Sequence, residues 1–199
     1  MKKKLKEDII RSQHCQRNWD LSKQVLDEDI DLIVYAATNC PSKQNVSFYN
    51  LHVISNREII EKIHLNTKGF SYEGRNMTNS QVLANLLLVF SYHDSDRQKM
   101  IQDKYGTTIE SLSVDRLMAI GIASGYTNLI SSILGYNTGY CACFDNEEIK
   151  KVLDIQDDIM LIIGIGFEDK TKDRKVHHID DSFTYPAIPK EDIKVTYLK

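Results

Sequence analysis

Apolar positions along the first part of the chain recur at helical spacing. Residues 7–18 are polar and predict the beginning of a short helix, and Ser22 is a suitable cap for a second helix that runs to about Thr38. The second helix is predicted from apolar residues three and four apart, namely Val25, Leu26, Ile30, Ile33, Val34 and Ala37. Pro41 disfavours helical geometry in the residue before it, so this helix should end just after Thr38.

Further along, the apolar residues gather in short runs that predict β-strands. Three strands are predicted, at Phe48–Ser55, Leu86–Tyr92 and Asp158–Phe167. Two short helices lie between them, capped by Asn56 and Asn146, and residues 66–80 are polar and typical of a loop. Because helices and strands mix without strict alternation, the order favours an α+β fold over a doubly wound parallel sheet.

The segment Val114–Leu134 predicts a long helix that is rich in small side chains, including Gly121 and Gly125. A glycine costs a helix about 1 kcal/mol relative to alanine, so close packing should offset it. That packing could come from a second subunit or from inside the same subunit, and the sequence favours neither strongly. Ile193–Leu198 predicts a lone terminal strand, which needs a sheet edge to pair with, and a partner subunit could supply that edge.

The overall composition is that of an ordinary soluble globular protein. The chain has 199 residues, 42% of them hydrophobic and 27% charged, with a net charge of −3. One domain over residues 1–199 is expected from this length. The charge invites neither nucleic acid nor an anionic membrane, and no apolar run is long enough for a membrane span or a signal peptide. The expected location is therefore the cytoplasm, with the four cysteines reduced.

Familiar catalytic and nucleotide-binding motifs are missing from the sequence. It contains no glycine-rich dinucleotide or P-loop motif, no nucleophile-elbow motif and no zinc-protease motif. The pair Cys141-x-Cys143 lacks a second ligand pair, so packed thiols are favoured over a metal site. The adjacent His177 and His178 are interpreted as a solvated loop pair.

Three polar clusters form a more coherent candidate site. They cover residues 13–17, 41–47 and 172–174, and each places cations, amides or hydroxyl groups beside the end of a helix or strand. Such groups are what a phosphate and the polar edge of a heterocycle require, although ordinary exposed loops have a similar composition.

In order and spacing, these segments resemble the nitroreductase family over roughly residues 10–178. The run Pro41–Phe48 followed by the strand Leu51–Ile54 is similar to the family's flavin loop. Gln13–Asp20 occupies the place of its phosphate-gripping segment, and Gly139–Asp145 that of the segment over the flavin ring. The long central helix, the strand Leu161–Gly166 and the basic residues after it complete the resemblance.

The resemblance implies an FMN site with named residues. Arg17, Lys172 and Arg174 would neutralise the phosphate, beside Gln13, His14 and Cys15 of the gripping segment. The flavin's polar edge would be held by the loop that contains Pro41, Ser42, Gln44, Asn45 and Ser47, with Asn79 as a further contact. Tyr140, Cys141, Ala142 and Cys143 would lie against the ring, with a backbone N–H near the flavin N5. No side chain is nominated as catalytic and none as a metal ligand.

The same resemblance implies a fold and an activity. It implies a central, mainly antiparallel sheet flanked by helices, in an intertwined homodimer whose C-terminal extension, residues 184–199, packs on the partner and exchanges a strand. Hydride would pass from NAD(P)H through FMN to a nitroaromatic, quinone or related acceptor. Gln13, Cys15, Ser47 and Cys143 replace residues common in the family, so a flavin-binding protein with little turnover is an alternative. An unrelated α+β interaction protein without a cofactor is a third.

Overall fold

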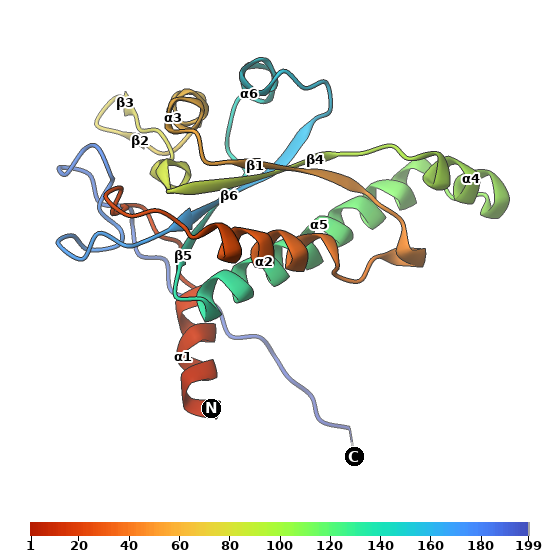
Figure 1. Ribbon diagram of the computed structural model, residues 1–199, viewed down its shortest axis with the longest axis horizontal. Helices are drawn as coiled ribbons and strands as arrows, with labels where there is room; N and C mark the ends of the chain where they lie inside the picture. The colour runs from red at the N-terminus through yellow and green to blue at the C-terminus, as the bar shows by residue number, and fades with distance from the viewer. Residues whose placement is uncertain (199) are drawn as a thin grey trace.

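A four-stranded antiparallel sheet forms the centre of the protein in the computed structural model, which describes residues 1–198 (Figure 1). The strands are β1 (Tyr49–Ile54), β4 (Leu86–Tyr92), β6 (Ile159–Gly166) and β5 (Asn137–Cys141), in that spatial order. A separate hairpin pairs β2 (Ser71–Tyr72) with β3 (Arg75–Asn76). The α-helices are α1 (Lys2–Ser12), α2 (Asp27–Thr38), α3 (Arg57–Leu65), α4 (Asp96–Tyr105), α5 (Ile109–Ile133) and α6 (Asn146–Leu153). Two short 3₁₀ turns are η1 (Lys43–Asn45) and η2 (Ser80–Leu83). The predicted α+β class and antiparallel sheet are confirmed.

Both faces of the sheet are covered, which explains why β4 is apolar at nearly every position. Leu87 and Val89 pack under α3, η2 and α6, whereas Leu86, Leu88 and Phe90 face α2 and α5. All five side chains are fully buried. A strand that buries both faces has no polar alternation, so the continuous runs at residues 86–92 and 158–167 were sufficient signals for β4 and β6.

Several predicted helix ends were wrong because local hydrogen bonds compete with capping. Ser22 does not cap α2, since its backbone N–H and its hydroxyl both bond to Asp20 Oδ1 in a turn, and α2 begins five residues later. Asn146 does not cap α6, because its side chain bonds the backbone of Ile159 and thereby ties the helix to β6. Asp145 is the cap instead and accepts from Glu148 N–H. The end of α2 at Thr38 and the Asn56 cap of α3 are confirmed.

The structure contains elements that the periodicity did not indicate. Helix α4 is polar and shows no apolar stripe, and β5 carries Asn137 and Gly139, which are poor strand formers. The first helix also lies earlier than predicted, at Lys2–Ser12, and α5 begins at Ile109, capped by the Thr108 hydroxyl.

Two glycines allow η2 to lie directly on the sheet. A Cβ at Gly139 would come within 2.8 Å of the carbonyl oxygen of Gln16, and one at Gly164 would collide with the carbonyl oxygen of Gln81. Because neither residue has a side chain, the backbones of residue 16 and of η2 can approach β5 and β6 closely. This approach brings Asn79, the cap of η2, to the end of the sheet where the candidate site lies.

The C-terminal residues extend away from the body without joining the sheet (Figure 1). Ile193, Val195 and Tyr197 are largely exposed, and residues 190–198 form no strand in this subunit. The predicted terminal strand therefore has no pairing edge of its own, and its exchange with a partner stays a prediction. Among the described residues, no helix is long and apolar enough to cross a membrane.

Candidate functional site

The segment after α1 lies along β5 and begins the site. Cys15 forms a parallel bridge with Thr138, and the Gln16 N–H donates to the Thr138 carbonyl at 2.8 Å. The Asn18 side chain donates to the carbonyls of Asp173 and Val176, at 2.6 and 3.1 Å. These contacts bring the first and third polar clusters of the sequence together, although more than 150 residues separate Asn18 from Asp173.

Two guanidinium groups converge where these segments meet. Arg17 Nη1 and Arg174 Nη1 both donate to the carbonyl oxygen of Cys15, each at 3.3 Å. Burial lowers the pKa of Arg17, and the nearby charge of Arg174 lowers it further, while Cys15 and Tyr185 oppose the change. The buried Arg17 Nε has no hydrogen-bond partner. Neither arginine is within ion-pair distance of a carboxylate in residues 1–198, so the pair presents uncompensated positive charge.

The end of β5 supplies the second part of this region. Cys141 is buried, and burial raises the pKa of its thiol to about 11. The Cys143 backbone and the Asn79 side chain act in the opposite direction and lower this pKa. The thiol is therefore protonated at neutral pH and is neither a nucleophile nor a ready metal ligand. Ala142 and Cys143 are exposed. Tyr140 donates its hydroxyl to the Ser124 carbonyl at 2.7 Å, which fixes its ring against α5.

Other expected site residues have different surroundings. Gln13 and His14 are exposed at the end of α1. Lys172 pairs with Asp181 at 2.6 Å, so its charge is already compensated, unlike that of Arg174. His177 is 3% exposed and its ring stacks on Tyr185, so the interpretation of His177 and His178 as a solvated pair was wrong. Among the described residues, no three His, Cys, Asp or Glu side chains are grouped to hold a metal ion.

Residues Pro41–Ser47, expected from the resemblance to contact the flavin, lie in a separate place, beyond the end of α2. Gln44 and Asn45 adopt left-handed backbone angles, with φ of 55° and 54°, in the turn η1. Arg97 Nη2 donates to the Gln44 carbonyl at 3.0 Å, and Gln98 Nε2 donates to the Ser47 carbonyl at 2.5 Å. The side chains of Pro41, Gln44, Asn45 and Ser47 are exposed, and Ser42 is partly so. Ser42, Asn45 and Ser47 line a cavity of about 380 Å³ with Tyr49 and Leu51.

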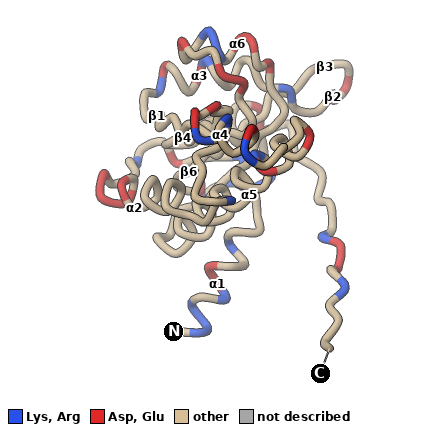
Figure 2. The backbone as a smooth tube through the Cα atoms, turned by 90° about the vertical axis from the view of Figure 1, so that its right-hand side faces the viewer, with Lys and Arg blue, Asp and Glu red and all other residues tan. Residues whose placement is uncertain are grey.

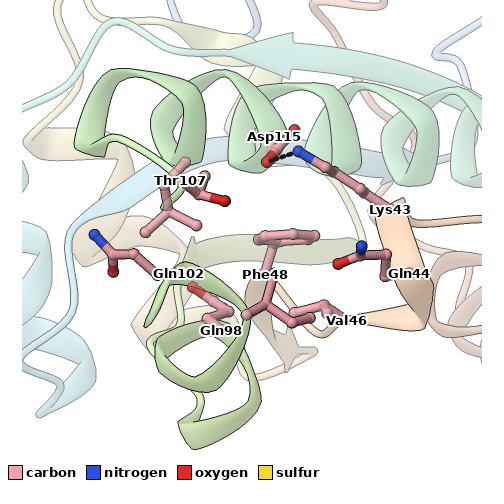
Figure 3. A pocket seen from close by; sticks show the side chains of 10 residues that line it. Lys43, Gln44, Val46, Phe48, Gln98, Gln102, Thr107 and Asp115 are labelled. Atoms are coloured by element: carbon pink, nitrogen blue, oxygen red, sulfur yellow. Dashed lines mark hydrogen bonds and ion pairs between the residues drawn. The ribbon is translucent and has the colours of Figure 1, made fainter. Parts of the chain in front are cut away.

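The loop Pro41–Ser47 is held by contacts with α4 and α5. Figure 3 shows the ring of Phe48 between the two helices, below the ion pair of Lys43 with Asp115. That ion pair measures 2.6 Å, and Phe48 is 3% exposed. The loop is thus a preformed surface, because backbone carbonyls and a buried aromatic ring fix its shape.

The two groups of site residues do not meet within one subunit. The flavin loop is joined to α5 at Asp115, whereas the segment before Cys15 is joined to α5 at Asn128, whose side chain donates to the Ser12 carbonyl. These positions are separated by 13 residues of helix, or ~20 Å at 1.5 Å per residue. Figure 1 shows the flavin loop and β5 near opposite ends of α5. The expected site residues of one subunit therefore form two separate groups.

Two buried residues that support Arg17 were not predicted from the sequence. Tyr185 lies under the Arg17 guanidinium, and Ser80 donates its hydroxyl to the Arg17 carbonyl at 2.8 Å. Tyr185 falls in the proline-punctuated tail that was expected to pack on a partner, but it is 3% exposed within its own subunit. The available sequence signal was an aromatic residue directly before Pro186.

The fold is that of an α+β protein with a four-stranded antiparallel sheet, and Arg17 and Arg174 meet beside β5 at the Cys15 carbonyl. The sequence model of the nitroreductase family matches residues 10–167, and the chain belongs to that family. No curated protein sequence matches it.

Solved structures with the same fold come from several bacteria, at low identity. A nitroreductase family protein of Streptococcus pneumoniae has 17% identity and a TM-score of 0.64, over 92% of this chain and 98% of that one. An FMN-dependent nitroreductase of Clostridium difficile has 19% identity and a TM-score of 0.57, over 85% and 88%. A protein of Exiguobacterium sibiricum solved in complex with FMN has 16% identity and a TM-score of 0.65, over 92% of each chain.

Proposed function

We propose that this protein is an FMN-dependent oxidoreductase whose flavin phosphate is held by Arg17 and Arg174. The observation that carries the proposal is the convergence of both guanidiniums on the Cys15 carbonyl without a carboxylate partner. Two like charges at this separation repel each other, and an anion placed against them would relieve that repulsion. Guanidinium groups bind phosphate oxygens through short, charge-assisted hydrogen bonds. The FMN-bound relative from Exiguobacterium supports the choice of anion.

The residues at the end of β5 fit the flavin ring better than they fit covalent catalysis. The Cys141 thiol is protonated and bonded towards the Cys143 carbonyl, and Tyr140 is fixed to Ser124, so this surface is neutral and preorganised. Exposed Ala142 and Cys143 leave their backbone open to a bound ring. When bound, FMN supplies the hydride chemistry that carries electrons from NAD(P)H to a nitroaromatic, quinone or related acceptor. The protein supplies orientation, and no side-chain acid or base is assigned.

The second half-site is supplied, in this proposal, by the partner in a homodimer. Ser42 and Asn45 lie too far along α5 to reach a ring bound at β5 of the same subunit, so a second copy must bring them. An apolar face of α5 is available for that contact: Leu117, Met118, Ile122, Tyr126, Leu129 and Ile133 are 36–59% exposed. A Cβ at Gly121 or Gly125 would meet nothing within 4 Å, so these glycines do not serve packing inside the subunit. Residues 121–133 of α5 contain no charged residue, and Figure 2 shows where Lys, Arg, Asp and Glu lie along the backbone.

The visible spectrum of the purified full-length protein tests the proposal. A flavin band, or its appearance after addition of FMN, is expected, followed by NAD(P)H oxidation in the presence of menadione or a nitroaromatic. Replacing both Arg17 and Arg174 by Gln should abolish flavin retention. The matched control is Lys23→Gln, because Lys23 is an exposed cation paired with Asp20 outside the site. A colourless protein that takes up no FMN would contradict the proposal, and a flavin-loaded protein without turnover would favour the non-enzymatic flavin-binding alternative.

A further inference from the structure

Tyr185 occupies a central position beneath the paired arginines. Its hydroxyl donates to the Thr78 carbonyl at 2.8 Å and accepts from the Ser80 N–H at 3.3 Å. These bonds fix the ring, which is 3% exposed. The aromatic side chain therefore has a single defined orientation.

The Tyr185 ring is in contact with a cation and with an imidazole. The Arg17 guanidinium carbon lies 4.5 Å from the ring centroid, a distance at which the negative face of the ring attracts a cation. The ring of His177 stacks on Tyr185 with an interplanar angle of 23° and a centroid distance of 6.0 Å. Three contacts thus position Arg17. Its carbonyl accepts from the Ser80 hydroxyl, its guanidinium donates to the Cys15 carbonyl, and the same guanidinium lies over the Tyr185 ring.

Tyr185 also closes the loop that follows the second arginine. Its backbone N–H donates to the Lys175 carbonyl at 2.9 Å, and Val176 pairs with Thr184 in an antiparallel bridge. The loop over residues 175–185 therefore returns to the residue next to Arg174. One residue contacts Arg17 through its ring and the chain beside Arg174 through its backbone.

We propose that Tyr185 is a positioning residue that orients Arg17 and Arg174 towards the phosphate of the flavin. This inference rests on the proposed function and adds to it a residue from the C-terminal segment of the same subunit. The ring face attracts the Arg17 guanidinium and holds it beside Arg174, despite the repulsion between the two charges. The effect is directed at the phosphate end, because Tyr185 contacts Arg17, the backbone beside Arg174 and η2 rather than the surface formed by Ala142 and Cys143.

Comparison of FMN with riboflavin separates a positioning role from a merely structural one, because riboflavin lacks the phosphate. For Tyr185→Leu in the full-length protein, we expect the dissociation constant for FMN to rise about tenfold and that for riboflavin to change less than twofold. Tyr185→Phe keeps the ring and loses the hydroxyl bonds, so it should retain the preference for FMN even if the protein melts at a lower temperature.

Phe183→Leu is the matched control. Phe183 is equally buried, and its ring contacts Tyr185 at 4.9 Å, together with His177 and Tyr72, in the same aromatic cluster. The Phe183→Leu variant should be less stable than the wild type, but its ratio of FMN to riboflavin affinity should be unchanged. In an Arg17→Gln background, Tyr185→Leu should lower FMN affinity much less than in the wild type, because the group that it positions is gone.

The inference would be overturned if Tyr185→Leu weakened the binding of FMN and of riboflavin by the same factor. It would also be overturned if Phe183→Leu lost as much of the preference for FMN as Tyr185→Leu does. Both results leave the proposed flavin function intact, provided that the wild type prefers FMN. A wild-type protein that binds neither flavin would instead contradict the proposed function and the inference together.

Discussion

The exposed face of α5 predicts that one added charge will separate the proposed dimer. Met118 is 59% exposed in the single subunit, one turn from Gly121 and Ile122 on the same face. Replacing it by Glu should leave the subunit folded, because the side chain is mostly outside the core. In a dimer with two-fold symmetry the change occurs twice, once in each copy.

The magnitude follows from the exposed fraction of the side chain. Full burial of a methionine contributes ~1.5–3 kcal/mol, so burying the 59% that is exposed here contributes about 1–2 kcal/mol per copy. Two copies give about 2–4 kcal/mol, which raises the dimer dissociation constant about 30- to 1000-fold. Desolvation of the carboxylates adds to this loss.

Sedimentation velocity over a range of protein concentrations measures the effect. Met100→Glu is the matched control, because Met100 is 57% exposed on α4 and the substitution adds the same charge. We expect Met118→Glu to be monomeric at concentrations where the wild type and Met100→Glu are dimeric, with unchanged circular dichroism. Equal association of all three proteins, or equal dissociation of the two variants, would refute the assignment of this face to the dimer contact.

Three further outcomes are expected. Gly164→Ala should lower the free energy of unfolding by about 1–3 kcal/mol in urea titrations, because the new Cβ collides with the Gln81 carbonyl. Gly121→Ala meets open space within the subunit and should not destabilise the separated subunit, measured in the Met118→Glu background. His64 is buried and neutral, and burial, with His177 as the next cause, lowers its pKa to about 4. Below pH 6.5 the unfolded state then binds more protons than the folded state, so the free energy of unfolding should fall by at most about 3 kcal/mol between pH 7 and pH 4. His64→Gln should make the free energy of unfolding less dependent on pH, as measured by denaturant titrations at each pH. Deleting residues 190–199 should leave the thermal unfolding of the subunit unchanged and weaken its dimer in the sedimentation assay, and an unaltered dimer would count against strand exchange.

The sequence was sufficient for elements whose cause is local. The apolar run at Leu86–Tyr92 and the Asn56 cap depend on neighbouring residues, and both are present in the structure. Ser22 and Asn146 failed as caps because Asp20 and Ile159 offered competing hydrogen bonds, and the second of these partners is distant in the chain. Helix α4 was missed because a polar helix on the surface leaves no periodic signal.

In the candidate site, too, features with local causes could be predicted from the sequence and features with distant causes could not. Arg17 and Arg174 could be named from charge, order and resemblance, but their convergence depends on Asn18 bonding across more than 150 residues. Tyr185 could not be named, since its contacts with Arg17 and Ser80 exist only after the tail has folded back on η2. The residues proposed to act on a ligand leave a chemical signal in the sequence, whereas the residue proposed to position them is visible only in the packing.

The separation of the half-sites couples the proposed dimer to the proposed cofactor. If a flavin gripped by Arg17 and Arg174 also contacts Ser42 and Asn45 of the other copy, it binds the dimer more tightly than the monomer. Reciprocity then requires the flavin to tighten the dimer by the same factor. A change on α5 that never touches the flavin, such as Met118→Glu, must therefore weaken flavin binding in proportion to the dimer that it removes. Arg17→Gln must in turn reduce the gain in dimer stability that added FMN produces. The apolar face of α5 and the arginine pair are then two parts of one binding equilibrium, although ~20 Å of helix lies between the half-sites in each subunit.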